Sequence, residues 1–148
     1  MSKRSDDLLE SLEVLTWENY VDIADAVTRF DKHNIDDELM RQASVYSYYQ
    51  GLLSLSKKYL DDANLELTKY TAQTRKEHKS HSFPKKLTAK DLDDFVESDE
   101  DFSLYTKVVN EASFKYTLLK GLVSALDHKK DMLVQLSSNR RAETNLYK

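Results

Sequence analysis

The chain has 148 residues, a formal net charge of −4, 40% hydrophobic residues and 32% charged residues. It contains no cysteine, which excludes disulfides and thiolate metal sites and is typical of proteins in a reducing compartment. Two glycines and one proline allow few turns, so the composition predicts an all-α fold built from long amphipathic helices.

No apolar run approaches the roughly 18 residues of a membrane-spanning helix. The first residues, Met-Ser-Lys-Arg-Ser-Asp-Asp, lack the apolar stretch of a signal peptide. We therefore expect a cytoplasmic protein with no membrane partner.

Residues 1–35 are expected to form an acidic helical segment. Residues 1–40 hold eleven acidic and four basic residues. Apolar residues recur at helical spacing through residues 5–31, which predicts one helix, or two helices with a break at Thr16. Trp17 is the only tryptophan, and the sequence leaves open whether it is a packing anchor or a hot spot for a partner.

Residues 36–148 are expected to form the second part of the chain, a long helical hairpin. Residues 36–78 contain no proline and carry two apolar stripes on adjacent flanks. Pro84 excludes helix through the following loop. Residues 100–138 carry two further stripes whose spacing alternates between three and four, as in helical bundles, and we expect this helix to end at Ser137-Ser-Asn139.

One stripe on each long helix can pair within the chain, which predicts an antiparallel arrangement. The second stripe is expected to stay exposed and to bring copies of the chain together in a helical oligomer such as a ring. The expected oligomerisation residues are Tyr116, Leu119, Leu122, Val123, Leu126, Met132, Leu133 and Leu136.

The connection between the long helices is first basic and then acidic. Residues 69–90 hold seven basic residues and one acid, whereas residues 91–101 hold seven acids and no base. Thr88 and Asp91 have the spacing of an N-cap and its third residue, which predicts a short helix to about Ser98. The acidic run either improves solubility, screens the basic residues, or imitates the acidic tail of a single-strand binding protein.

A cluster of cations at this position is suited to contact phosphates. The candidate DNA-binding residues are Lys69, Arg75, Lys76, Lys79, Lys85, Lys86 and Lys90. Tyr70 and Phe83 flank them and are the candidates for base stacking. For residues 75–79 taken alone, a solvated helix C-terminus is the alternative, because the helix dipole favours cations there.

The sequence shows no signature of catalysis. It has no glycine-rich phosphate loop, no nucleophile elbow and no Glu-x-x-His motif, so we expect no catalytic residue and no cofactor. His78 and His81, with Glu77 beside them, come nearest to a metal site. Zinc requires three or four ligands, so polar residues at a helix end are the favoured interpretation, and we expect no metal.

A long helix with basic residues at its end is followed here by a short acidic helix and a terminal helix with leucine pairs. On these features, residues 67–136 resemble the recombination mediator proteins of tailed phages, the UvsY-like family. The resemblance implies rings of helical subunits that bind single-stranded DNA and help a RecA-like recombinase to replace the single-strand binding protein. It places the DNA contacts on Lys69, Arg75 and Lys76, although residues 69–76 depart from the family's tighter Lys-x-Arg and Gly-Arg pattern.

Two functions therefore follow from the sequence. The first is a recombination mediator whose partners are single-stranded DNA, a RecA-like recombinase, a single-strand binding protein and further copies of the chain. The alternative is a phage structural or scaffolding coiled-coil protein that binds no nucleic acid.

Overall fold

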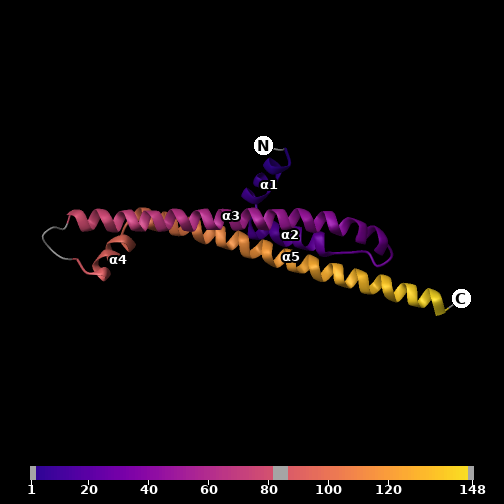
Figure 1. Cartoon of the computed structure of the whole chain (residues 1–148). Helices are drawn as coiled ribbons and strands as arrows, with labels where there is room; N and C mark the ends of the chain where they lie inside the picture. The colour runs from indigo at the N-terminus through magenta and orange to yellow at the C-terminus, as the bar shows by residue number, and fades with distance from the viewer. Residues whose placement is uncertain (1–2, 82–86, 147–148) are drawn as a thin grey trace. The chain divides into compact units, whose positions relative to one another are not determined.

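The computed structural model describes residues 3–81 and 87–146, and all regular secondary structure in that part of the chain is α-helical. The all-α prediction is therefore confirmed. The helices are α1 (Lys3–Glu13), α2 (Trp17–Thr28), α3 (Ile35–His81), α4 (Ala89–Glu97) and α5 (Glu100–Leu146) (Figure 1). Within the described residues, no helix is both long enough and apolar enough to cross a lipid bilayer.

Capping residues set two of the helix starts. Thr16 Oγ1 accepts a hydrogen bond from the backbone N–H of Asn19 at 3.4 Å, and the backbone N–H of Thr16 donates to Asn19 Oδ1 at 2.9 Å. Of the two predictions for the first segment, two helices with a break at Thr16 is the correct one. Thr88 and Asp91 form the same reciprocal pair at the start of α4, as their spacing predicts.

The predicted end of the last helix is wrong, because α5 continues from Asn139 to Leu146. Two side-chain contacts accompany the extra turns. Arg141 Nη2 donates to Ser137 Oγ at 3.2 Å, and Thr144 Oγ1 donates to the carbonyl of Arg140 at 2.8 Å. The segment contains neither glycine nor proline, so serine and asparagine alone do not stop the helix.

The helices form two compact units. Unit 1 comprises Met1–Ser56 and Lys115–Lys148, and unit 2 comprises Lys57–Phe114. Both long helices contribute a segment to each unit. These two units differ from the two parts expected from the sequence, which are residues 1–35 and residues 36–148.

The core of unit 1 joins α1 to both long helices. Leu12 and Leu15 from the α1 end, Leu52 from α3 and Leu119 from α5 form one buried cluster. Tyr20 and Ile23 of α2 pack against it. Within this unit the α3 and α5 segments run in opposite directions, because Gln42 Nε2 donates to the Leu126 carbonyl at 2.6 Å while Leu52 meets Leu119 ten residues further along α3.

This packing covers most of the stripe that was expected to bind a second copy. Five of the eight expected oligomerisation residues are at most 7% exposed within the single chain: Leu119, Leu122, Val123, Leu126 and Leu133. The expectation that these five lie free for another subunit is therefore wrong. The residues that precede α3 bury these side chains. Leu12, Leu15 and Ile23 line the same apolar region as Leu119 and Leu122. Of the other three, Tyr116 and Leu136 are half-buried and Met132 is 52% exposed.

Two lysines of α5, two heptads apart, hold the ends of the first two helices. Lys115 Nζ donates to two carbonyls at the C-terminus of α1, at 2.9 and 3.0 Å. Lys129 Nζ donates to two carbonyls at the end of α2, both at 3.0 Å, and to Glu38 Oε2 at 2.9 Å. The last carbonyls of a helix have no partner within the helix, so these ammonium groups satisfy them.

Replacing Lys129 by alanine is expected to lower the free energy of unfolding by about 2–4 kcal/mol, because it leaves the half-buried Glu38 carboxylate and two carbonyls without their partner. Urea denaturation followed by circular dichroism measures the change. Lys130→Ala is the matched control, since Lys130 is half-exposed, water screens its ion pairs, and its loss should change stability far less. Equal effects of the two substitutions would contradict this role for Lys129.

Candidate nucleic-acid interface

The basic residues of the described chain that were expected to bind DNA all lie in unit 2. Four of them project from the last turns of α3, and one lies in the first turn of α4: Lys69, Arg75, Lys76, Lys79 and Lys90. Lys85, Lys86 and Phe83 fall outside the described residues. The structure thus places five of the seven predicted cations in one unit.

Two of these cations already have acidic partners. Lys69 Nζ lies 2.7 Å from Glu66 Oε1, one turn earlier on α3. Arg75 pairs with Asp93 and so connects α3 to α4. All four side chains are about half-exposed, so water screens both pairs, and each contributes about 1 kcal/mol or less. A phosphate group can therefore replace either carboxylate at small cost.

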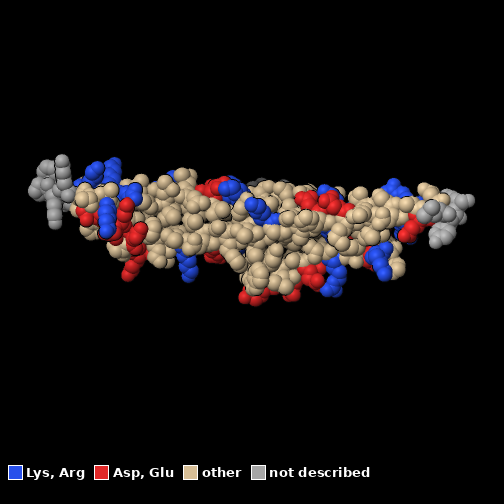
Figure 2. All heavy atoms as spheres, turned by 90° about the horizontal axis from the view of Figure 1, so that it is seen from below, with Lys and Arg blue, Asp and Glu red and all other residues tan. Residues whose placement is uncertain are grey.

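The other three cations are exposed lysines. Lys76, Lys79 and Lys90 form no ion pair with any other described residue. Lys76 and Lys79 are three residues apart, so they are neighbours on the helix surface. Towards the end of the view where Figure 1 places α4, Figure 2 shows Lys and Arg side chains next to Asp and Glu side chains. The surface is thus a mixture of charges in which these three lysines are the unpaired cations.

Tyr70 differs from the free stacking platform predicted on the sequence. Its ring stacks on Tyr105, with ring centroids 4.8 Å apart and planes 28° from parallel. Its hydroxyl is hydrogen-bonded to Asp99. One face of the ring is therefore occupied within unit 2, and a nucleotide base can approach only the other face.

The acidic helix α4 is attached to the basic end of α3 by more than charge. The His78 imidazole stacks on the Phe95 ring, with centroids 4.6 Å apart and planes 9° from parallel. Val96 is 3% exposed and anchors the same helix. The acids of α4 are plain in the sequence, but the contacts of Asp93 and Phe95 with α3 were not predicted. The signal available was the helical spacing of Arg75 and His78, which places them on one face.

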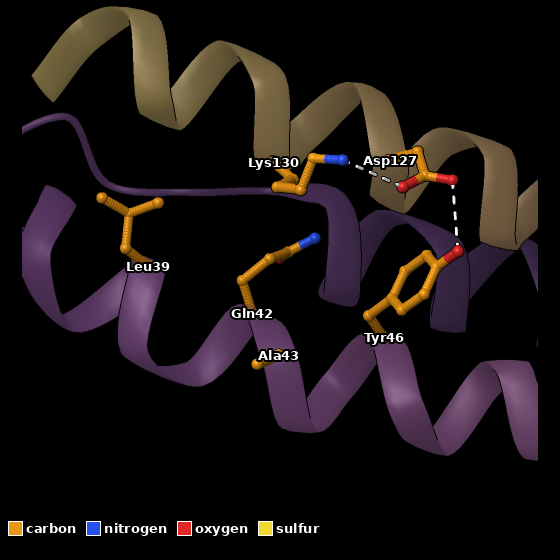
Figure 3. Close-up of a pocket in the computed structure, with 6 residues that line it drawn as sticks. All are labelled: Leu39, Gln42, Ala43, Tyr46, Asp127 and Lys130. Carbon is orange, nitrogen blue, oxygen red and sulfur yellow. Dashed lines mark hydrogen bonds and ion pairs between the residues drawn. The ribbon is translucent and has the colours of Figure 1, made fainter. Parts of the chain in front are cut away.

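Unit 1 has a different polar constellation, around Asp127. Tyr46 donates to Asp127 Oδ2 at 3.3 Å, and Lys130 Nζ lies 3.3 Å from Asp127 Oδ1, so the two groups reach separate oxygens of the carboxylate (Figure 3). The hydrogen bond to Asp127 raises the pKa of Lys130, followed by the charge of Asp131. Leu39, Gln42 and Ala43 complete a shallow hollow here. Tyr46 and Lys130 thus satisfy both oxygens of the Asp127 carboxylate, and we interpret this constellation as a structural contact.

The described residues contain no group of three or more His, Asp or Glu side chains placed to share a metal ion. His78, one of the residues weighed as a ligand on the sequence, uses its ring in the stack on Phe95. The basic end of unit 2, where Lys76, Lys79 and Lys90 have no acidic partner among the described residues, is therefore the candidate site.

No family model, no curated protein and no solved structure matches this chain.

Tyr70 is expected to titrate above the ordinary tyrosine pKa. Partial removal from water raises its pKa first, and the hydrogen bond to Asp99 raises it further. The neutral phenol is thus favoured by folding, so its stabilising effect is complete below the ordinary pKa and is lost as the pH rises through the raised one. Asp99→Asn should move the pKa back towards the ordinary value, because it removes the charge but keeps an oxygen for the N–H of Asp101.

NMR titration with ring-labelled tyrosine measures this pKa, and Tyr70→Phe identifies the signal. A Tyr70 signal that titrates with the exposed tyrosines in both proteins would show that the contact with Asp99 does not form.

Proposed function

We propose that the protein is a recombination mediator that acts in the cytoplasm by binding. It binds single-stranded DNA as an oligomer and promotes the exchange of a single-strand binding protein for a RecA-like recombinase. The observation that carries the proposal is the set of three exposed lysines, Lys76, Lys79 and Lys90, which have no acidic partner among the described residues. The two protein partners and the exchange itself rest on the resemblance of residues 67–136 to the UvsY-like family.

Single-stranded DNA suits this surface because its contacts are mainly to phosphates. Each lysine that neutralises a phosphate releases counterions, and this release drives binding without sequence preference. Arg75 and Lys69 can join when phosphates displace Asp93 and Glu66 from their exposed pairs. The lysines supply the first contacts, and the paired cations enlarge the site once the strand is bound.

Three free lysines make a weak site in one subunit, so the proposal includes an oligomer. In an antiparallel arrangement of the long helices, several copies in a ring present their basic ends along one track, and effective concentration multiplies the affinity. Exposed apolar side chains are available for such contacts on α5: Leu104 is 61% exposed, Val108 55% and Met132 52%. Met132 is the most exposed of the eight residues first expected to join the subunits.

The second candidate is a structural or scaffolding protein that binds no nucleic acid. The pairing of Arg75 with Asp93 and of Lys69 with Glu66 favours it, because the chain supplies its own acids to part of the basic cluster. Nucleic-acid binding at low salt separates the two candidates.

Reversing the three free lysines together to glutamate, at Lys76, Lys79 and Lys90, is expected to abolish binding to a fluorescent single-stranded oligonucleotide at low salt. The wild-type protein should bind with an affinity that falls steeply as salt is raised, because about 0.7 counterions are released for each phosphate neutralised on a single strand. Fluorescence anisotropy at several salt concentrations gives both the affinity and the slope.

The matched control reverses three exposed basic residues of unit 1, Lys32, Lys120 and Arg140, and changes the net charge equally. It should reduce affinity far less than the first variant. If both triple variants lose the same affinity, the basic end of unit 2 is not the site. If the wild-type protein binds no DNA at low salt, the scaffolding function is the better account.

Asp93→Asn is expected to raise affinity for single-stranded DNA a few-fold. The substitution removes the carboxylate that pairs with Arg75, so the guanidinium becomes a further phosphate contact and the repulsion between Asp93 and DNA disappears. Asp94→Asn is the control, since it removes the same charge at an exposed neighbouring position that forms no ion pair with a described residue. A larger gain from Asp94→Asn would mean that total charge, and not release of Arg75, sets the affinity.

A further inference from the structure

Three apolar side chains lie exposed where α1 meets α2 in unit 1. Val14 is 60% exposed, Trp17 54% and Val21 48%. Trp17 and Val21 are one helical turn apart on the outer side of α2. Val14 lies next to the first turn of the same helix, because Asn19 Nδ2 donates to its carbonyl at 2.7 Å. We call this surface, with its acidic neighbours Glu13, Glu18 and Asp22, the Trp17 face.

The inner side of α2 already has a partner, so these exposed residues are not needed for the core. Tyr20 and Ile23 on that side pack against the buried cluster of unit 1. Trp17 stacks on Tyr20, with centroids 5.8 Å apart and planes 25° from parallel. The indole is thus held against an anchored ring. Its side chain therefore loses little conformational freedom when a ligand binds to it.

The exposed charged side chains that α1 and α2 carry beside Trp17 are negative, while Lys115 of α5 lies at the Leu12 and Glu13 carbonyls. Glu13, Glu18 and Asp22 are exposed, and none of them pairs with a cation in the described part of the chain. Hydrogen bonds from the backbone N–H of Glu18 and from Thr16 lower the pKa of the Glu18 carboxyl, which keeps it ionised. The nearest cation in sequence, Arg29, pairs with Asp25 at 2.5 Å. An aromatic and aliphatic surface therefore stands among unpaired carboxylates.

This combination decides which partner fits. Nucleic acids and anionic lipid surfaces are repelled by the carboxylates, and the same face of a second copy is repelled for the same reason. Simple cations gain nothing from Trp17 and the two valines. A polypeptide that presents apolar and cationic side chains together satisfies both halves of the surface, and an amphipathic helix does so in the smallest length.

We propose that the Trp17 face docks a basic amphipathic helix of a partner protein. Trp17 and Val21 bind the apolar side of that helix, while Glu18 and Asp22 pair with its lysines and arginines. Trp17 is the expected hot spot, since tryptophan contributes most per residue at protein interfaces. The site lies in unit 1, and it does not depend on whether unit 2 binds DNA.

The lone tryptophan makes the proposal testable in the full-length protein. The probe is a synthetic helical peptide of about 18 residues, or five helical turns, with leucine on one side and lysine on the other. Titrating it should shift the Trp17 emission to shorter wavelength and saturate at one peptide per chain. A matched peptide with glutamate in place of every lysine should leave the emission unchanged. Equal binding of the two peptides would overturn the proposal.

Variants locate the peptide, with anisotropy of a labelled peptide as the readout. Trp17→Ala and the double variant Glu18→Lys with Asp22→Lys should each weaken binding by about tenfold or more, as expected for a hot spot and its charged rim. The control in the same unit combines Val134→Ala with Glu143→Lys, which alters one exposed valine and one exposed acid and should change affinity less than twofold. Circular dichroism checks that each variant keeps its helix content.

Two further outcomes also overturn the proposal. Equal loss of affinity in the control and in the variant with Glu18→Lys and Asp22→Lys would mean that the peptide responds to overall acidity. If Trp17→Ala lowers the mass of the protein in sedimentation while peptide binding persists, the Trp17 face is covered by a second copy of the chain.

Discussion

The packing of the first two helices on the leucines of α5 determines what the rest of the surface is free to do. Leu119 and Leu122 lie in one apolar region with Leu12, Leu15 and Ile23. Each leucine fully buried in this way contributes about 2 kcal/mol. The acidic N-terminal segment is therefore a structural part of unit 1, and it covers Leu119 and Leu122 of α5 within the same chain. Other apolar side chains stay exposed, among them Leu104 and Val108 of α5 and the residues of the Trp17 face.

Three kinds of basic residue can be distinguished by their partners. Lys115 and Lys129 are structural, because their ammonium groups satisfy carbonyls at helix ends. Lys69 and Arg75 are held by exposed carboxylates in pairs that contribute little net energy, so they can exchange one anion for another. Lys76, Lys79 and Lys90 have no acidic partner among the described residues. A count of basic residues along the sequence cannot separate these kinds, because the partners of Lys115, Lys129 and Arg75 are distant in the chain.

The sequence predicted the helices well because their boundaries are local. Thr16 and Thr88 each cap a helix by accepting a hydrogen bond from the backbone N–H three residues later. This spacing is visible without a structure. The end of α5 was misplaced, since serine and asparagine only weaken a helix and two side-chain contacts offset that weakness. The burial of Leu122 and Leu126 was misjudged for a different reason. Both were assigned to the contact between copies of the chain, although the apolar side of α2 also needed a surface to cover.

The candidate site was predicted in composition but not in arrangement. The cations near the end of α3 were visible as a run, whereas the stacks of Tyr70 on Tyr105 and of His78 on Phe95 join residues far apart in sequence. Helical periodicity shows which side chains share a face but not which helix covers it. Aromatic residues beside lysines therefore suggest base stacking equally well whether they are exposed or already stacked on another ring.

The Trp17 face and the three lysines without an acidic partner lie in different units, and this separation has a consequence for the two proposals. The unpaired carboxylates beside Trp17 belong to unit 1, while the unpaired lysines of α3 and α4 belong to unit 2. An anionic polymer is attracted to the second surface and repelled by the first, and a cationic peptide shows the opposite preference. One chain can then bind both ligands without competition for the same residues. A mediator that must contact DNA and a protein at the same time needs this property, whereas a scaffold without ligands gains nothing from it.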